Sequence, residues 1–443
     1  MKIRFYNARI LTMEDPLEVI WGEVWICDDR IVHAGPVEEY VQESKRAKSA
    51  RWDREIDAEG NLMMPGFKNA HTHSGMTFLR SYADDLPLLE WLNQKVFPME
   101  ALITGDDIYL LSKLAIMEYL TSGITSNFDM YLTPDTISKA AEDCGYRTVI
   151  CGAVNDFTQS VEELGDWYQK YNQPGKLVSF MLGFHAEYTT SREILEGIAD
   201  LAVRFKAPVY AHNSESAGEV AQCLELNGRT PTAYLDSLGL FAYGGGGFHC
   251  VHMTQEDLEI FRDRRLSAIT NPSSNLKLAS GIAPIKAMMD MGVNIAIGTD
   301  GPASNNCLDM FREMFLTTAL AKLREQDASA VDAGKVLRMA TAGGARAMGL
   351  TDCDVLAPGK KADIIMVDLH QPNMQPIHDI GKNIVYSGSK QNVKMTMVDG
   401  KILYEDGKFH IGQDPEEIYF RANEIVSKTT GSFSEMTRSK RLK

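Results

Sequence analysis

The chain has 443 residues, of which 44% are hydrophobic and 24% are charged, a composition that excludes disordered, collagen-like and simple coiled-coil proteins. Its net charge of −15 disfavours binding to nucleic-acid polymers, because an acidic surface repels phosphate backbones. No apolar run reaches the roughly 18–20 residues that span a bilayer. The seven cysteines include no Cys-x-x-Cys pair. We therefore expect a cytoplasmic protein without disulfides or membrane association.

Short β-strands are expected at both ends of the chain, where segments rich in Ile, Val and aromatic residues alternate with turn residues. The N-terminal segments are 3–10, 19–26 and 30–34. The C-terminal segments are 362–368, 383–386, 393–398 and 401–404, with Asp399-Gly400 as a hairpin signal between the last two. This pattern predicts one small β-sandwich domain formed by residues 1–63 and 354–414. A helix and tail are expected over 415–443.

Between these ends, apolar strand candidates alternate with stretches of helical periodicity. The eight strand candidates are 62–73, 124–130, 148–154, 178–185, 208–212, 247–252, 266–271 and 293–299. The helix candidates are 106–120, 134–144, 191–205, 254–264, 308–322 and 330–348. The alternation predicts the α/β class and a (β/α)8 TIM-like barrel over 64–353. An open doubly wound sheet is disfavoured, because no G-x-G-x-x-G turn is present.

Histidine and acidic residues lie at the C-terminal ends of these strands, where barrel enzymes carry their active sites. His71 and His73 share one face at the end of the first strand, His212 ends the fifth, and Asp300 ends the eighth. Imidazoles and a carboxylate suit a zinc ion that keeps one position open for water. We therefore predict that these four residues bind one divalent metal per subunit, with Zn²⁺ favoured and Fe²⁺ or Ni²⁺ as alternatives.

Glu215 and His249 are candidates for catalysis beside this metal, which would activate water as a nucleophile. Glu215 lies three positions after His212, so it reaches the site only if the chain turns between them. It would then shuttle protons to a substrate nitrogen. His249, on the sixth strand, would hydrogen-bond the attacking water or the developing oxyanion. Asp300 is a further candidate, as the acceptor of the water's proton.

Several stretches resemble the amidohydrolase superfamily. Residues 64–73 resemble its first-strand signature, and 212–215, 249–252 and 298–306 are similar to later strands of its aminohydrolase branch. Residues 271–278 are similar to the 5′-methylthioadenosine/S-adenosylhomocysteine deaminases within that branch. The likeness covers nearly the whole chain. It implies a metal-dependent hydrolytic deaminase of an adenosine-type nucleoside, such as adenosine, 5′-methylthioadenosine or 5′-deoxyadenosine, and a dimer or tetramer.

The resemblance also assigns substrate contacts. It implies that Glu100 binds the ribose hydroxyls, that His185 contacts the substrate, and that Glu215 and His249 flank the purine ring at the reacting carbon. Members of the family carry an Arg shortly after the third strand, but residues 149–165 contain none. A guanidinium is the natural partner of a carboxylate, so its absence favours a substrate without the homocysteine carboxylate.

Two alternatives use the same site. One is an aminohydrolase of another heterocycle, such as guanine, cytosine, a pterin or an s-triazine. The other is a hydrolase of cyclic amides or C–Cl bonds. His185-Ala186-Glu187 matches half of the small zinc nucleobase deaminase signature, but the P-C-x-x-C half is absent. A non-enzymatic scaffold is disfavoured, because all four proposed ligands are present.

Overall fold

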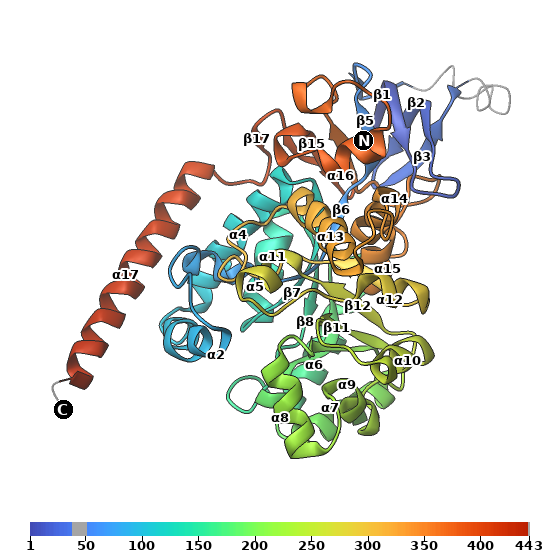
Figure 1. Ribbon diagram of the computed structural model, residues 1–443. Helices are drawn as coiled ribbons and strands as arrows, with labels where there is room; N and C mark the ends of the chain where they lie inside the picture. Colours follow the sequence, from blue (N-terminus) through green and yellow to red (C-terminus); the bar gives the residue numbers. More distant parts are fainter. Residues whose placement is uncertain (38–50, 442–443) are drawn as a thin grey trace.

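Eight parallel strands form the centre of the molecule, in a computed structural model that describes residues 1–37 and 51–441 (Figure 1). The strands are β6 (Phe67–Thr72), β7 (Ile124–Met130), β8 (Arg147–Cys151), β9 (Val178–Ala186), β10 (Val209–Asn213), β11 (Gly245–His249), β12 (Ser267–Thr270) and β13 (Asn294–Ile297). Each strand pairs in parallel with the next one along the chain. The Asp300 amide after β13 donates to the His71 carbonyl on β6 at 2.9 Å, so the ring nearly closes. The predicted α/β barrel is confirmed.

Helices surround these strands. The α-helices before the C-terminal one are α2 (Leu88–Trp91), α3 (Phe97–Glu100), α4 (Gly105–Thr121), α5 (Pro134–Cys144), α6 (Val161–Tyr171), α7 (Arg192–Phe205), α8 (Ala217–Asn227), α9 (Pro231–Ser237), α10 (Gln255–Asp263), α11 (Pro272–Lys277), α12 (Ile285–Asp290), α13 (Met310–Glu325), α14 (Ala333–Arg338), α15 (Gly344–Ala347) and α16 (Ile380–Tyr386). Short 3₁₀ or π segments are η2 (Ser74–Leu79), η3 (Leu92–Val96), η4 (Glu187–Thr189), η5 (Met339–Gly343), η6 (Pro372–Met374) and η7 (Lys390–Asn392). Helix α7 buries Leu195, Ile198 and Ala202, whose spacing forms one apolar face.

The predicted first strand, 62–73, is divided into two strands at Gly66. Strand β5 (Leu62–Pro65) pairs with β1 and β14 outside the barrel, and β6 begins the barrel. A Cβ atom at Gly66 would lie 2.1 Å from the Thr125 Cγ2 atom. Glycine is therefore favoured here, where the backbone lies directly against the Thr125 side chain.

Both ends of the chain contribute to a nine-stranded sheet within the described residues. Its strands are β1 (Lys2–Leu11), β2 (Val19–Cys27), β3 (Arg30–Gly35), β4 (Arg54–Asp57), β5, β14 (Ile364–Val367), β15 (Val393–Val398), β16 (Lys401–Glu405) and β17 (Lys408–Phe409). The small β domain expected from both termini is confirmed, and hydrogen bonds join its strands into one continuous sheet. The Asp399-Gly400 hairpin connects β15 to β16, with both residues at positive φ.

The segment 383–386 was expected to be a strand, and this prediction is wrong. It belongs to helix α16, whose first turn is capped by the Asp379 side chain accepting from the Lys382 amide. Ile380 and Ile384 are buried four residues apart, which is helical spacing. A short apolar run alone does not distinguish the two structures.

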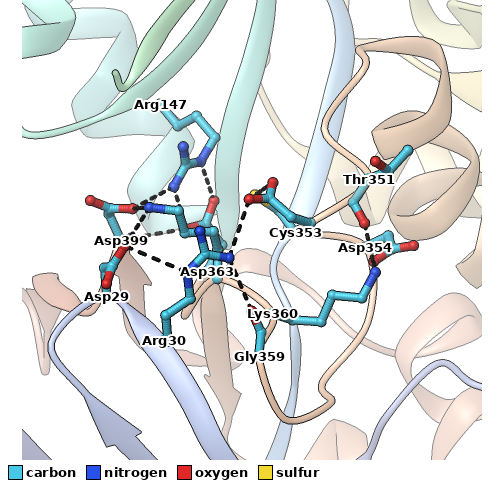
Figure 2. A network of polar contacts seen from close by, with 12 residues as sticks. Asp29, Arg30, Arg147, Thr351, Cys353, Asp354, Gly359, Lys360, Asp363 and Asp399 are labelled. Atoms are coloured by element: carbon cyan, nitrogen blue, oxygen red, sulfur yellow. Dashed lines mark hydrogen bonds and ion pairs between the residues drawn. The ribbon is translucent and has the colours of Figure 1, made fainter. Parts of the chain in front are cut away.

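A buried ion pair connects the barrel to this sheet (Figure 2). Arg147, the first residue of β8, donates to both carboxylate oxygens of Asp363, at 2.6 and 3.0 Å. Its Nη2 atom also donates to Asp399 at 2.9 Å. The guanidinium holds the pKa of Asp363 below its usual value, although burial acts in the opposite direction. The contact lies at the amino-terminal end of β8, away from the strand ends that carry the predicted site.

The chain continues after the sheet into α17 (Pro415–Arg441), which runs along α4 and α3 and extends to one side of the barrel (Figure 1). None of the helices in residues 1–37 and 51–441 is both long and apolar enough to cross a bilayer.

Candidate active site

The proposed metal ligands converge at the carboxyl ends of three barrel strands. His71 is on β6 and His73 follows it, His212 is on β10, and Asp300 follows β13. Ligand atoms of the three histidines all lie within 4.8 Å of one another. The same holds for His71, His249 and Asp300. Residues far apart in the sequence therefore form one cluster.

Asp300 lies at the centre of this cluster. Its Oδ1 atom is 3.5 Å from His71 Nε2 and 3.2 Å from His73 Nε2. Its Oδ2 atom accepts hydrogen bonds from the Ser274 and Ser304 hydroxyls, at 2.6 and 2.7 Å. Asp300 also has a φ of 59°, a conformation that costs energy for any residue with a side chain. The surrounding hydrogen bonds hold this strained residue in place.

Backbone carbonyls orient two of the imidazoles. His73 Nδ1 bonds to the Met130 carbonyl, and His212 Nδ1 bonds to the His185 carbonyl at 2.7 Å. A proton donated from Nδ1 leaves the Nε2 lone pair free to bind a metal. His71 is fully buried, and neither of its ring nitrogens has a hydrogen-bond partner among the described residues. Buried polar atoms are normally paired, so this ring fits the role of a metal ligand.

Burial and mutual charge shift the pKa values in the cluster. Burial lowers the pKa of His71 to about 3, despite the opposing effect of Asp300, so this imidazole is neutral. Burial also opposes charge on His73, but the Asp300 carboxylate raises its pKa to about 8. Burial would raise the pKa of Asp300, but these histidines hold it well below its usual value. An ionised carboxylate beside imidazoles is a donor set that fits a divalent cation.

The chain turns after His212, as the position of Glu215 requires. Ser214 has a φ of 52°, and Glu215 faces the same cavity as His212. The Glu219 carboxylate fixes this turn by accepting from the Glu215 amide at 2.7 Å. Burial raises the pKa of Glu215, while His249, 3.9 Å away, acts to lower it. A carboxyl group with a raised pKa is suited to exchanging protons.

His249 is oriented by a residue that sequence reasoning had not selected. Its Nδ1 atom bonds to the Asn275 Oδ1 atom at 2.8 Å, and its Nε2 atom lies 4.0 Å from Asp300. Asn275 is on α11. Ser274 and Ser304 were missed in the same way. The only sequence signal for these three residues is their position in stretches 271–278 and 298–306, which carry the family resemblance.

A cavity of about 470 Å³ opens onto the cluster. Its lining includes the predicted residues His73, Glu100, His185, His212, Glu215, His249 and Asp300. Glu100 comes from the end of α3, and its Oε1 atom is buried without a hydrogen-bond partner in the described part of the chain. Burial raises the pKa of Glu100 to about 7. His185 bonds to the Thr189 hydroxyl at 2.9 Å, and burial lowers its pKa to about 4.

Comparison with known proteins places this site in a family. The model of the Amidohydrolase family matches residues 62–403, which include every proposed site residue. The chain belongs to the amidohydrolase family. Its barrel and the cluster at the strand ends are therefore features of a family member.

The similarity to relatives and to a solved structure covers nearly the full length of this amidohydrolase. The 5-methylthioadenosine/S-adenosylhomocysteine deaminase of Caldanaerobacter subterraneus subsp. tengcongensis is 37% identical, covering 95% of this chain and 96% of its own. The deaminase of the same name from Pelotomaculum thermopropionicum is 38% identical, covering 95% and 97%. The crystal structure of an adenosine deaminase from Xanthomonas campestris with bound zinc has a TM-score of 0.90 and 32% identity, covering 97% and 98%.

Proposed function

We propose that this amidohydrolase is a metal-dependent deaminase that hydrolyses the exocyclic amine of an adenosine-type nucleoside and releases ammonia. One observation carries the proposal: one cavity is lined by His73, His212 and Asp300 of the cluster and by Glu100, whose buried Oε1 atom has no hydrogen-bond partner among the described residues. The histidine and aspartate cluster suits metal-assisted hydrolysis, and the Glu100 carboxylate is an acceptor for hydroxyl groups. The names of the relatives, at 37–38% identity, support the same activity.

We propose Zn²⁺ as the metal, held by His71, His73, His212 and Asp300. Fe²⁺ and Ni²⁺ remain the alternatives for this donor set. When bound, the metal lowers the pKa of a water molecule toward neutrality and so supplies hydroxide as the nucleophile. The zinc in the structure of the Xanthomonas campestris adenosine deaminase supports this choice.

The side chains of this protein then have distinct tasks. The Glu215 carboxyl group transfers a proton to the ring nitrogen beside the reacting carbon. His249 hydrogen-bonds the oxygen that attacks this carbon, and the Asp300 carboxylate accepts a proton from it. Glu100 accepts hydrogen bonds from the ribose hydroxyls, and His185 contacts the substrate. The exocyclic amine then takes up the proton held by Asp300, and its C–N bond breaks to release ammonia, while the product keeps the new C–O bond.

The quaternary structure and the division of the chain are also proposals. We propose a dimer or tetramer, built from subunits with a small β domain (1–63 and 354–414), a barrel (64–353) and a C-terminal segment (415–443). Light scattering coupled to size-exclusion chromatography would measure the number of subunits.

An ammonia-release screen tests the proposed activity. The purified protein would be offered adenosine, 5′-methylthioadenosine, 5′-deoxyadenosine, guanine and cytosine, with metal content measured on the same sample. We expect ammonia from at least one adenosine-type nucleoside and about one divalent metal ion per subunit. Ammonia from guanine or cytosine but from no adenosine-type nucleoside would contradict the proposed substrate class.

A further inference from the structure

Outside the proposed metal site, the cavity is lined by acidic side chains but by no lysine or arginine among the described side chains. Three carboxylates line it, from Glu100, Glu215 and Asp300. Among the side chains that the structure describes, which exclude those of residues 434–441 on α17, no Lys or Arg lines the cavity. Its remaining lining is largely apolar and aromatic, with Trp91 and Phe157 among the side chains. Away from the metal site, a ligand carboxylate in this cavity would lose water without gaining a cationic side chain as its partner, which is unfavourable.

The cations nearest in sequence to the lining segments have partners of their own. Each lies within three residues of a lining residue, and each contacts an aromatic ring or a carboxylate. These pairs are Lys95 with the Tyr82 ring, Arg192 with Glu196, and Lys277 with Asp84. A substrate carboxylate would have to compete with these existing contacts to recruit one of them.

The loop between β8 and α6 presents the uncharged side chain of Phe157 to the cavity. Gln159 anchors this loop: its Oε1 atom accepts from the Ala153 amide at 2.9 Å, and its Nε2 atom donates to the Tyr131 and Leu132 carbonyls at 3.1 Å. Phe157 projects from the same loop and is 85% exposed. The loop therefore places an aromatic ring, and no cation, at the solvent-exposed part of the lining.

We infer that this cavity selects adenosine-type nucleosides whose 5′ substituent carries no carboxylate. This inference rests on the proposed deaminase function and narrows it. The relatives' names join two substrates that differ in this respect, since 5-methylthioadenosine has a neutral methylthio group and S-adenosylhomocysteine ends in an ammonium and a carboxylate. A methylthio group suits an aromatic and apolar lining, because thioethers contact aromatic rings favourably. The cavity of this chain is therefore suited to 5-methylthioadenosine.

Three thioethers test the selection. The metal-loaded enzyme would be assayed for kcat/KM with 5′-methylthioadenosine, S-adenosylhomocysteine and 5′-(3-aminopropylthio)adenosine, which lacks only the carboxylate of the homocysteine compound. We expect kcat/KM for S-adenosylhomocysteine to be about 100-fold below that for 5′-methylthioadenosine, as expected for an unpaired buried charge. The aminopropyl compound should recover most of this loss.

Two outcomes would overturn the inference while leaving the deaminase function intact. One is comparable kcat/KM for S-adenosylhomocysteine and 5′-methylthioadenosine. The other is equally poor turnover of the aminopropyl compound, because substituent length and not the carboxylate would then set the selection. Ammonia release from none of the three, and from neither adenosine nor 5′-deoxyadenosine, would contradict the proposed function itself.

A cation introduced at Phe157 provides a second test. In Phe157→Arg the ratio of kcat/KM for S-adenosylhomocysteine to that for 5′-methylthioadenosine should rise about 10-fold, because a guanidinium pairs with the carboxylate. Phe157→Gln removes the ring without adding charge, so this control should not raise the ratio. Equal ratios in the two variants would contradict selection by charge at this position.

Discussion

Asn275 accepts a hydrogen bond from His249 and thereby fixes the orientation of the imidazole that faces Asp300. The Oδ1 atom of Asn275 lies 2.8 Å from His249 Nδ1. This contact places the Nδ1 proton toward α11 and leaves Nε2 directed at the cluster. Asn275 itself does not line the cavity, so it acts on the reaction through His249.

Asn275→Leu, which has a similar volume but no acceptor, should lower kcat about 10- to 100-fold. The metal content should stay at the wild-type value, because Asn275 contacts none of the proposed ligands. Kinetics and metal analysis on the same sample would check this expectation. The contrast with Asn275→Gln, which retains an amide oxygen, separates loss of the acceptor from loss of packing.

His71→Ala and Asp300→Ala should abolish both metal binding and turnover. The His71 ring nitrogens have no hydrogen-bond partner in the described structure, so removal of the ring costs no protein contact of that kind. Elemental analysis and ammonia release would be measured together, and circular dichroism would report the fold. Full activity in metal-free Asp300→Ala would contradict the mechanism.

Glu215→Gln should reduce kcat by about 10²- to 10⁴-fold while the metal stays bound, since the amide keeps the shape of the carboxyl group but cannot transfer its proton. In the wild type, burial raises the pKa of Glu215, so this carboxyl group stays protonated, and able to donate its proton, to a higher pH than an ordinary carboxyl group. The limb on which kcat/KM falls with rising pH should therefore lie above pH ~4.5. An unchanged kcat in the variant would contradict the proposed role of Glu215 in proton transfer.

Glu100→Gln should raise KM for ribosides with a smaller effect on kcat, because the lost interaction is with the sugar. The pKa of Glu100 is raised to about 7 by burial, so the acceptor carboxylate becomes protonated as the pH falls through 7. KM of the wild type should accordingly rise below pH 7, and this dependence should be absent in the variant. An unchanged KM in Glu100→Gln would contradict the ribose contact.

Arg147→Leu should lower the free energy of unfolding by about 3–5 kcal/mol, because Asp363 would be left as an unpaired buried charge. The Asp363 pKa is lowered in the folded protein, so the ion pair stabilises the fold above the usual carboxyl pKa. Its contribution is lost as the pH falls through the lowered value. Denaturant unfolding at neutral and acidic pH should show the difference between variant and wild type narrowing on acidification.

The double variant Arg147→Leu/Asp363→Leu provides the control for this pair. Its destabilisation should be smaller than the sum of the two single changes, since neither partner is left alone. Simple additivity would mean that the two side chains do not act as a pair.

The sequence was sufficient for features with a local signal. Alternating apolar and helical segments predicted the barrel, because each β/α unit has its own periodicity. The His71-x-His73 spacing and the positions of His212 and Asp300 at strand ends indicated a metal cluster, since parallel strands bring their carboxyl ends together. The apolar segment 383–386 shows the limit of this reasoning, because its hydrophobicity fits a strand and a helix equally well.

Only the three-dimensional arrangement revealed how the site is supported and what surrounds it. Ser274 bonds to Asp300 from 26 positions away, and Arg147 bonds to Asp363 from 216 positions away. Such partners have no periodic pattern, since the folding of the whole chain brings them together. The absence of an Arg over 149–165 was visible in the sequence. The sequence could not show that no Lys or Arg from elsewhere in the described part of the chain lines the cavity. That depends on where distant side chains lie, because the charge in a cavity is set by the residues of its walls and not by neighbours in the chain.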